Sequence, residues 1–170
     1  MSLPPLPCYL LGMIFYDIKE MPGLIARNTR LLGLDLGEKT IGLAISDPGL
    51  MVASPLETIA RKKFTLDAEK LEKILADRNI GGLVFGWPVN MDGSEGPRCQ
   101  STRQFARNLT ELRGLDLPIA FWDERLSTAA IERFLIDEAD MTRSRRDEVV
   151  DKMAAGYILQ GALDALARAR

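Results

Sequence analysis

The stretch "RLLGLDLGEKTIGLAISD", residues 30–47, predicts two β-strands joined by a tight turn. Both Leu31–Leu36 and Ile41–Ser46 are rich in residues that favour strands, and the four residues between them, "GEKT", are typical of a hairpin. A third antiparallel strand is expected at Met51–Ile59. Pro55 favours the edge of the sheet for this strand, because proline has no amide proton to donate to a neighbour.

Asp35 is the unusual residue of the first strand. Strand alternation places the three even-numbered leucines on one face and leaves Asp35 on the other, between Gly33 and Gly37. Flanking glycines leave space above the backbone, so the pattern indicates that a ligand approaches this carboxylate closely. The alternative is an aspartate near a strand end that bonds the following turn.

Strands and helices alternate through the rest of the chain. The runs "GLVFGWP" and "PIAFWDE" are apolar without alternation, which is typical of strands buried on both faces. The expected elements after the third strand are a helix through 66–75, a strand at 82–88, a helix from 97, a strand at 118–124, a helix after 127 and a last helix to about 169, capped by Ser144 and Asp147. This order predicts an α/β fold with a five-stranded mixed sheet, three antiparallel strands followed by two parallel ones, and helices on both faces.

Length and composition limit the possible functions. The 170 residues suit one domain, which we place at 29–170, after an N-terminal extension, 1–28, of unknown role. A net charge of −2 excludes a uniformly basic nucleic-acid-binding protein but allows a local basic patch. No apolar run approaches the roughly 18 residues that a membrane-spanning helix requires, so no membrane partner is expected. The two cysteines follow no metal-binding or redox spacing, which favours a reducing cytoplasm.

The chain has no histidine, which excludes Ser-His-Asp triads and histidine-ligated zinc. Any metal site must therefore use carboxylates, and Asp151 is one candidate. It heads an otherwise apolar stripe of the last helix that should face the sheet, formed by Ala154, Ala155 and Ile158. Because an unpaired buried carboxylate is costly, we expect either a cation shared with Asp35 or a salt bridge to an arginine such as Arg125 or Arg146.

Asp123 and Glu124 end the last predicted strand, where ligands commonly bind parallel sheets. They point to opposite faces, so only one can face Asp35, and the longer side chain favours Glu124 by a small margin. Asp35, Glu124 and Asp151 would form an oxygen-only site for one or two Mg²⁺ or Mn²⁺ ions. Such sites commonly support phosphoryl chemistry, including the cutting of phosphodiesters.

Four motifs in order, "GLDLGEKTIGLAISD", "GWPVNMDGSEGP", "DERLST" and "VVDKMAAGYILQ", resemble the YqgF/RuvX family of bacterial proteins. These are proposed pre-ribosomal RNA nucleases that were once described as Holliday-junction-resolvase-like. The resemblance covers about residues 30–166 and implies an RNase H-like fold. It also implies a cytoplasmic, metal-dependent endonuclease that matures the small-subunit ribosomal RNA precursor. The ribosomal subunit is a further candidate partner, and the sequence does not specify the oligomeric state.

The resemblance also implies catalytic roles by motif: Asp35 matches the first-strand acid, the pair Asp123 and Glu124 the fifth-strand acids, and Asp151 the helix acid. One departure is Thr40, where the family often has arginine, so a charge is missing next to Lys39.

Nucleic acid would need basic and hydrogen-bonding groups near these acids. In the loop "NMDGSEGPR" the glycines permit close approach of a sugar-phosphate chain, and Ser94 can bond phosphate oxygens. The alternative is a merely flexible connection. The residues that could form a basic edge are Lys39, Arg98, Arg103, Arg107, Arg125, Arg145 and Arg146, although charge runs are usually solvated faces.

Three other functions remain open. Holliday-junction cleavage needs the same chemistry and ordinarily a dimer. A non-catalytic RNA- or ribosome-binding factor would keep the fold but tolerate the change Asp35→Asn. The first motif also resembles the phosphate-binding hairpin of the ATP-binding actin and heat-shock-chaperone superfamily, but those proteins use two such domains and this chain has room for one.

Overall fold

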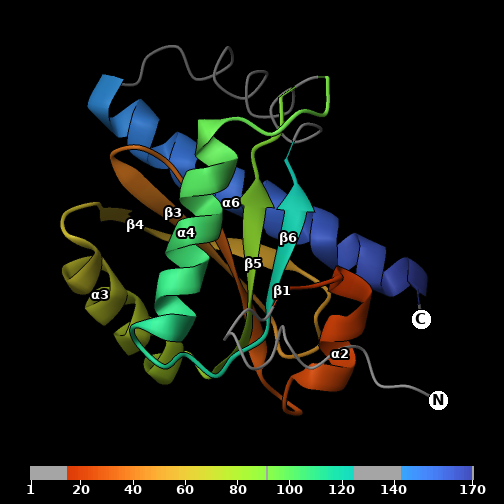
Figure 1. Ribbon diagram of the computed structural model, residues 1–170. Helices are drawn as coiled ribbons and strands as arrows, with labels where there is room; N and C mark the ends of the chain where they lie inside the picture. The colour runs from red at the N-terminus through yellow and green to blue at the C-terminus, as the bar shows by residue number, and fades with distance from the viewer. Residues whose placement is uncertain (1–14, 91, 125–142, 170) are drawn as a thin grey trace.

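The computed structural model of the protein describes residues 15–90, 92–124 and 143–169, and it contains one mixed sheet with helices on both faces (Figure 1). The strands are β1 (Phe15–Tyr16), β2 (Arg30–Leu36), β3 (Thr40–Ser46), β4 (Ala53–Ala60), β5 (Ile80–Trp87) and β6 (Ile119–Asp123). The helices are the short 3-10 helix η1 (Ile18–Glu20), α2 (Met21–Leu24), α3 (Phe64–Asp77), α4 (Pro97–Glu111) and α6 (Arg143–Ala169).

The sheet has the strand order β1-β6-β5-β2-β3-β4. The five predicted strands are confirmed: β2, β3 and β4 form an antiparallel meander, β5 is parallel to β2, and β6 is parallel to β5. Pro55 lies in β4 at the edge of the sheet, as its missing amide proton requires. The sixth strand, β1, adds a short parallel edge from the segment predicted to be an extension.

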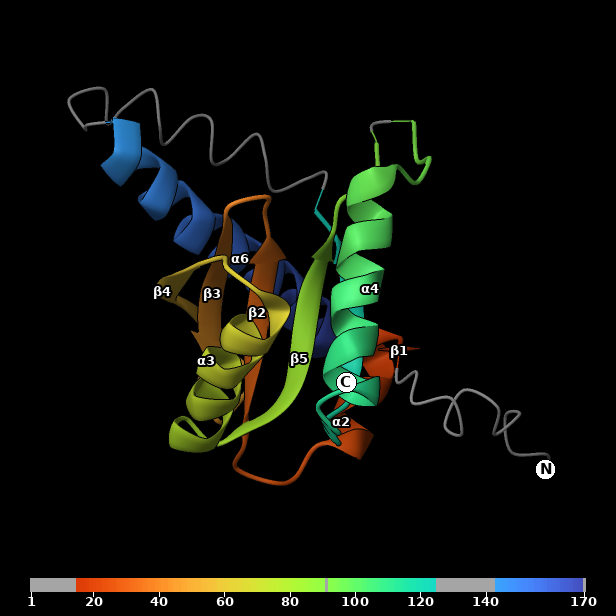
Figure 2. The same ribbon diagram turned by 60° about the vertical axis from the view of Figure 1, so that its left-hand side comes forward.

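Helices cover the two faces of the sheet unequally. Figures 1 and 2 show α3 and α4 on one face and the long α6 crossing the other. The helix expected after residue 127 lies outside the described residues. The predicted capping role of Ser144 is wrong, because α6 already includes Arg143, so Ser144 lies within the helix and not ahead of it.

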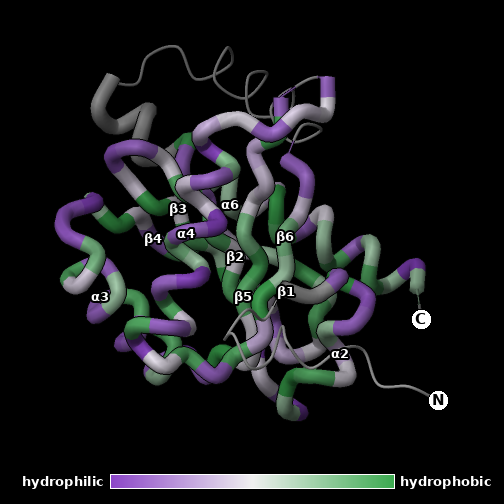
Figure 3. The backbone as a smooth tube through the Cα atoms, in the orientation of Figure 1, coloured by the Kyte–Doolittle hydropathy of each residue, from purple (hydrophilic) through white to green (hydrophobic). Residues whose placement is uncertain are grey.

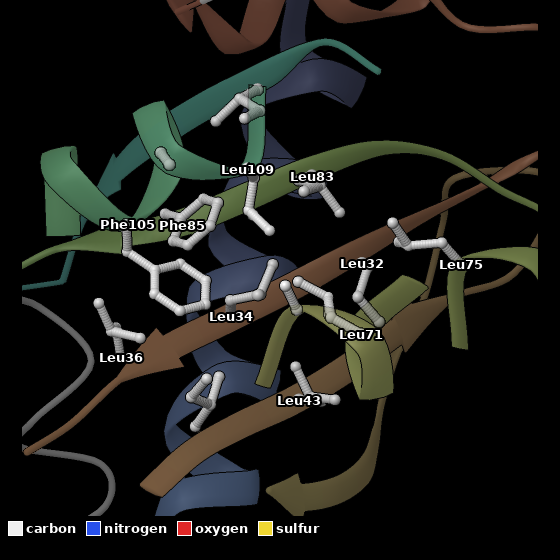
Figure 4. Packing of buried hydrophobic residues seen from close by; sticks show 14 of the residues in the cluster. Leu32, Leu34, Leu36, Leu43, Leu71, Leu75, Leu83, Phe85, Phe105 and Leu109 are labelled. Atoms are coloured by element: carbon white, nitrogen blue, oxygen red, sulfur yellow. The ribbon is translucent and has the colours of Figure 1, made fainter. Parts of the chain in front are cut away.

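The alternation of β2 decides which side chains meet which helix. Leu32, Leu34 and Leu36 pack into a core with α3 and α4, drawn in Figure 4. Leu31 belongs to the second core, beneath α6. The strands at the centre of the molecule are accordingly mostly hydrophobic in Figure 3. Asp35 therefore belongs to the face that α6 covers.

Part of the N-terminal segment is packed into this second core. Ile18 and Met21 are buried, and the Met21 side chain is fully inaccessible to solvent. A Cβ added to Gly82 of β5 would lie 2.7 Å from Cε of Met21, so the methionine fills space that the glycine leaves. The boundary at residue 28 stays a prediction, but residues before it contribute to the hydrophobic core. Within the described chain, no helix has the length and apolar character needed to cross a membrane.

We expect Met21→Ala to lower the free energy of unfolding by about 2–5 kcal/mol, because it removes a large buried side chain and leaves a cavity. Leu24→Ala is the matched control, since Leu24 is in the same helix but 43% exposed. Denaturant unfolding of the two variants measures the difference. If Met21→Ala and Leu24→Ala have the same free energy of unfolding, the N-terminal segment does not stabilise the core.

Candidate active site

Asp35 lies near the carboxyl end of β2, on the face toward α6. Its side chain is largely buried, and among the described residues we find no hydrogen bond or ion pair to its carboxylate. Burial, followed by the negative charge of Glu124, raises the pKa of Asp35 to about 7; Arg98 opposes the rise and Asp151 adds to it. A buried carboxylate without a hydrogen-bond partner is costly, which is typical of a site that a cation completes.

Glu124, rather than Asp123, is brought to Asp35. Asp123 pairs in register with Trp87 of β5, and alternation places the next residue, Glu124, on the opposite face, above Gly86. A Cβ at Gly86 would lie 2.5 Å from Oε2 of Glu124, so the missing side chain leaves room for this carboxylate. Burial raises the pKa of Glu124, Arg98 opposes the rise, and Asp123 adds to it.

Asp151 comes to the same edge from α6. The predicted stripe that follows it is buried against the sheet, at Ala154, Ala155 and Ile158. The Thr40 hydroxyl donates a hydrogen bond to Oδ2 of Asp151. The side chains of the alternative partner arginines, at 125 and 146, lie outside the described residues.

The chemistry of these residues fits a divalent cation, although Asp35, Glu124 and Asp151 are not grouped tightly enough to surround a single ion. The donors are carboxylate oxygens, which Mg²⁺ and Mn²⁺ prefer, and Asp35 is a partly buried acid whose ionised form a cation would stabilise. In the described ranges, however, no three acidic or cysteine side chains are grouped closely enough to hold a single ion. Asp35 and Glu124 are thus the central pair, and Asp151 is the third charge of the site.

The residues predicted to contact nucleic acid differ in what they touch. Nη1 of Arg98 lies 3.6 Å from Oε1 of Glu124, at the site itself. Arg103 lies farther along α4. Its Cζ lies 5.0 Å from the centroid of the Trp87 ring, and its Nη2 lies 3.0 Å from Oε2 of Glu95. These contacts hold the loop before α4 against β5, so Arg103 already has a structural role.

The remaining predicted contacts are less defined. Lys39 is exposed in the β2–β3 turn, and Arg107 is half-buried on α4. Ser94 donates to Asp92 and accepts from Asn90 within its own loop, which favours a role in shaping that loop. Arg125 lies outside the described residues, as do the side chains of Arg145 and Arg146.

Sequence reasoning missed the role of Thr40, which it treated only as a missing positive charge. The hydroxyl contacts an acid 111 residues away in the chain. The alternation of β3 was a local signal for this contact, because it places Thr40 and Gly42 on one face of the strand. Arg98 as the partner of Glu124 was likewise not foreseen.

The match to a family of known proteins covers most of the chain: the family model described as "RuvX: Holliday junction resolvase" matches residues 29–165. The chain belongs to the RuvX family. A relative from Rhodospirillum centenum is 62% identical over 157 residues, covering 91% of this chain and 83% of its own. Another, from Rhodospirillum rubrum, is 65% identical over 140 residues, with 82% and 86% covered. Both bear the name "Putative pre-16S rRNA nuclease".

The fold of this RuvX protein is also found among solved resolvases. The yeast mitochondrial Holliday junction resolvase Ydc2 aligns with a TM-score of 0.51 at 12% identity, covering 89% of this chain and 85% of that one. At this identity the likeness shows the fold alone, and it confirms the predicted RNase H-like class. Membership of RuvX confirms the predicted family and, with it, the predicted class of enzyme, a nuclease acting on nucleic acid.

Proposed function

We propose that this RuvX protein is a divalent-metal-dependent endonuclease that matures the precursor of 16S ribosomal RNA. The names of its relatives support the substrate. One observation of the site supports the chemistry: the buried Asp35 carboxylate faces Glu124 at the carboxyl end of parallel strands and has no hydrogen-bond partner among the described residues. A site of this kind is completed by a cation.

Asp35 and Glu124 would hold the ion, with Asp151 as the third acid. When bound, Mg²⁺ or Mn²⁺ lowers the pKa of coordinated water and stabilises negative charge on a phosphate. Asp35 must first lose its proton, because its raised pKa leaves it partly protonated near pH 7. Ile158 and Gly86 form an apolar floor under Glu124, which strengthens the electrostatic interactions above it.

Arg98 supplies the positive charge at the mouth of the site. Its side chain is 54% exposed, whereas that of Glu124 is only 18% exposed, so the guanidinium reaches from solvent toward the buried acids. We propose that Arg98 contacts a phosphate of the bound strand, as arginine does bidentately in many nucleic-acid sites. We further propose a cytoplasmic protein whose partner is the small ribosomal subunit precursor.

Cleavage of a four-way DNA junction is a second candidate, because the matching family model is described as a Holliday junction resolvase. The two substrates need the same chemistry at the scissile phosphate. The RNA and the DNA junction differ in their sugar and in the arrangement of their strands. Two carboxylates that hold an ion, Asp35 and Glu124, do not distinguish these features.

The test is cleavage of end-labelled 16S precursor RNA and a four-way DNA junction, each with Mg²⁺, Mn²⁺ or EDTA. The wild type is expected to cut the RNA with either ion and not with EDTA. Glu124→Gln should lower the rate by about 100-fold or more, and Asp123→Asn by much less, since only Glu124 faces Asp35. Binding of RNA without cleavage under any metal condition would favour the non-catalytic binding factor, and preferential cutting of the junction would favour the resolvase.

A further inference from the structure

Thr40 begins β3 and joins the hairpin to the last helix of the chain. Its hydroxyl donates a hydrogen bond to Oδ2 of Asp151. A hydrogen bond to a carboxylate is stronger and more directional than one between neutral groups. The contact therefore restricts the rotation of the Asp151 side chain and sets the direction of its carboxylate.

The turn that carries Thr40 is itself held on two sides. The Gly37 amide donates to the Thr40 carbonyl at 2.9 Å, which closes the hairpin. Arg61, just after β4, reaches the same turn twice: its amide donates to the Lys39 carbonyl at 2.8 Å, and its Nη1 donates to the Gly37 carbonyl at 2.6 Å. The Thr40 hydroxyl is thus presented from a fixed backbone.

The backbone of Asp151 is held at the same place. Gly42 lies two residues after Thr40 on the same face of β3, and a Cβ there would overlap the carbonyl oxygen of Asp151. Farther along α6, Ala155 and Leu159 lie against Gly33 of β2 in the same manner. The helix backbone is therefore positioned by glycines, and the Thr40 hydroxyl contacts the Asp151 side chain directly.

We propose that Thr40 is a positioning residue, whose hydroxyl aims the Asp151 carboxylate at the cation site formed by Asp35 and Glu124. Asp151 lies close enough to Asp35 for their charges to interact, so its direction matters to an ion held there. The inference rests on the proposed function, because it gives Asp151 a role at the metal site of the nuclease.

The experiment compares Thr40→Val, which keeps the shape of the side chain but removes the hydroxyl, with Thr40→Ser, which keeps the hydroxyl. Each is made in the full-length protein alone and together with Asp151→Asn. Thr110→Val is the matched control, because the Thr110 hydroxyl donates to the Ala106 carbonyl within α4, away from Asp35 and Asp151. The readouts are the Mn²⁺ dissociation constant from electron paramagnetic resonance, and kcat and KM for precursor RNA.

Removing a group that orients a metal-binding side chain typically weakens metal affinity or activity about 10- to 100-fold. Thr40→Val should therefore bind Mn²⁺ at least about 10-fold more weakly and lower kcat with little change in KM. Thr40→Ser should restore both, and Thr110→Val should change neither. In the Asp151→Asn background Thr40→Val should have no further effect, since Thr40 acts through that carboxylate.

Wild-type Mn²⁺ affinity in Thr40→Val would overturn the inference. So would an equal loss in the Asp151→Asn background, a failure of serine to rescue, or a wild type that binds no Mn²⁺. A wild type that binds Mn²⁺ but leaves the RNA intact would instead contradict the proposed function, and the role of Thr40 would then be decided by Mn²⁺ affinity alone.

Discussion

Replacing Asp35 by asparagine is expected to slow cleavage about 100- to 1000-fold and, at the same time, to stabilise the metal-free protein at pH 8. If Asp35 holds the proposed ion, its loss removes about 3–4 kcal/mol of transition-state stabilisation, which corresponds to a rate about 100- to 1000-fold lower. The gain in stability has a different origin: asparagine is neutral, and it removes a buried negative charge that no hydrogen bond within the described residues compensates.

The sign of the pH dependence follows from the raised pKa of Asp35. Its value is about 7 in the folded protein, against an ordinary value of 3.8. A carboxyl group whose pKa is raised by folding binds its proton more tightly in the folded state. Its stabilising contribution is therefore complete below pH 4 and is lost as the pH rises toward 7. Asp35→Asn should equal the wild type in stability at pH 4 and exceed it by about 2–4 kcal/mol at pH 8.

Denaturant unfolding in EDTA between pH 4 and pH 8 measures this difference. Asp47→Asn is the control, because its effect on stability should have the opposite sign. Asp47 accepts hydrogen bonds from the backbone amides of Val52 and Met51, and these bonds lower its pKa. Asp47 stabilises the fold above its unfolded pKa, so its replacement should cost stability at pH 8. If Asp35→Asn is no more stable than the wild type at pH 8, the Asp35 carboxylate is not the strained group that a metal site requires.

Replacing Gly42 by alanine is expected to be among the most damaging single substitutions in the sheet. A Cβ at this position would overlap the Asp151 carbonyl oxygen, and a backbone atom inside a long packed helix cannot rotate away as a side chain can. Overpacking of this kind costs about 1–3 kcal/mol and occasionally more, and we expect the upper end or beyond. The helix must move away from β3, which should also weaken Mn²⁺ binding.

Gly156→Ala makes the same chemical change on the other partner of this interface. Gly156 lies in α6, where an added Cβ would be 3.7 Å from Cγ of Pro55, an ordinary contact. Alanine in a helix interior is favoured over glycine by about 0.5–1 kcal/mol, so this variant should be slightly more stable. Similar unfolding free energies for the two variants would show that the close approach at Gly42 does not hold α6 in place.

Much of the fold was accessible from local patterns. The hairpin residues, the edge position of Pro55 and the buried runs of β5 and β6 each carry a signal within a few residues, because strand alternation and proline chemistry act locally. The alternation of β2 also placed Asp35 opposite the leucine core, as found. The segment around Met21 was missed as part of the core, because its one short helical turn has no periodicity to read.

Local sequence patterns were enough to give the order of β2 to β6 with the helices α3, α4 and α6, to exclude histidine chemistry, and to supply the set of acids from which a site could be built. The packing of distant segments was needed to show that Glu124 and not Asp123 meets Asp35, that Arg98 reaches this pair, and that Thr40 bonds Asp151. These contacts lie beyond the reach of local patterns because the partners are far apart along the chain. The contact between Thr40 and Asp151, 111 residues apart, depends on how α6 packs against Gly33 and Gly42 of the sheet. No local pattern encodes that packing.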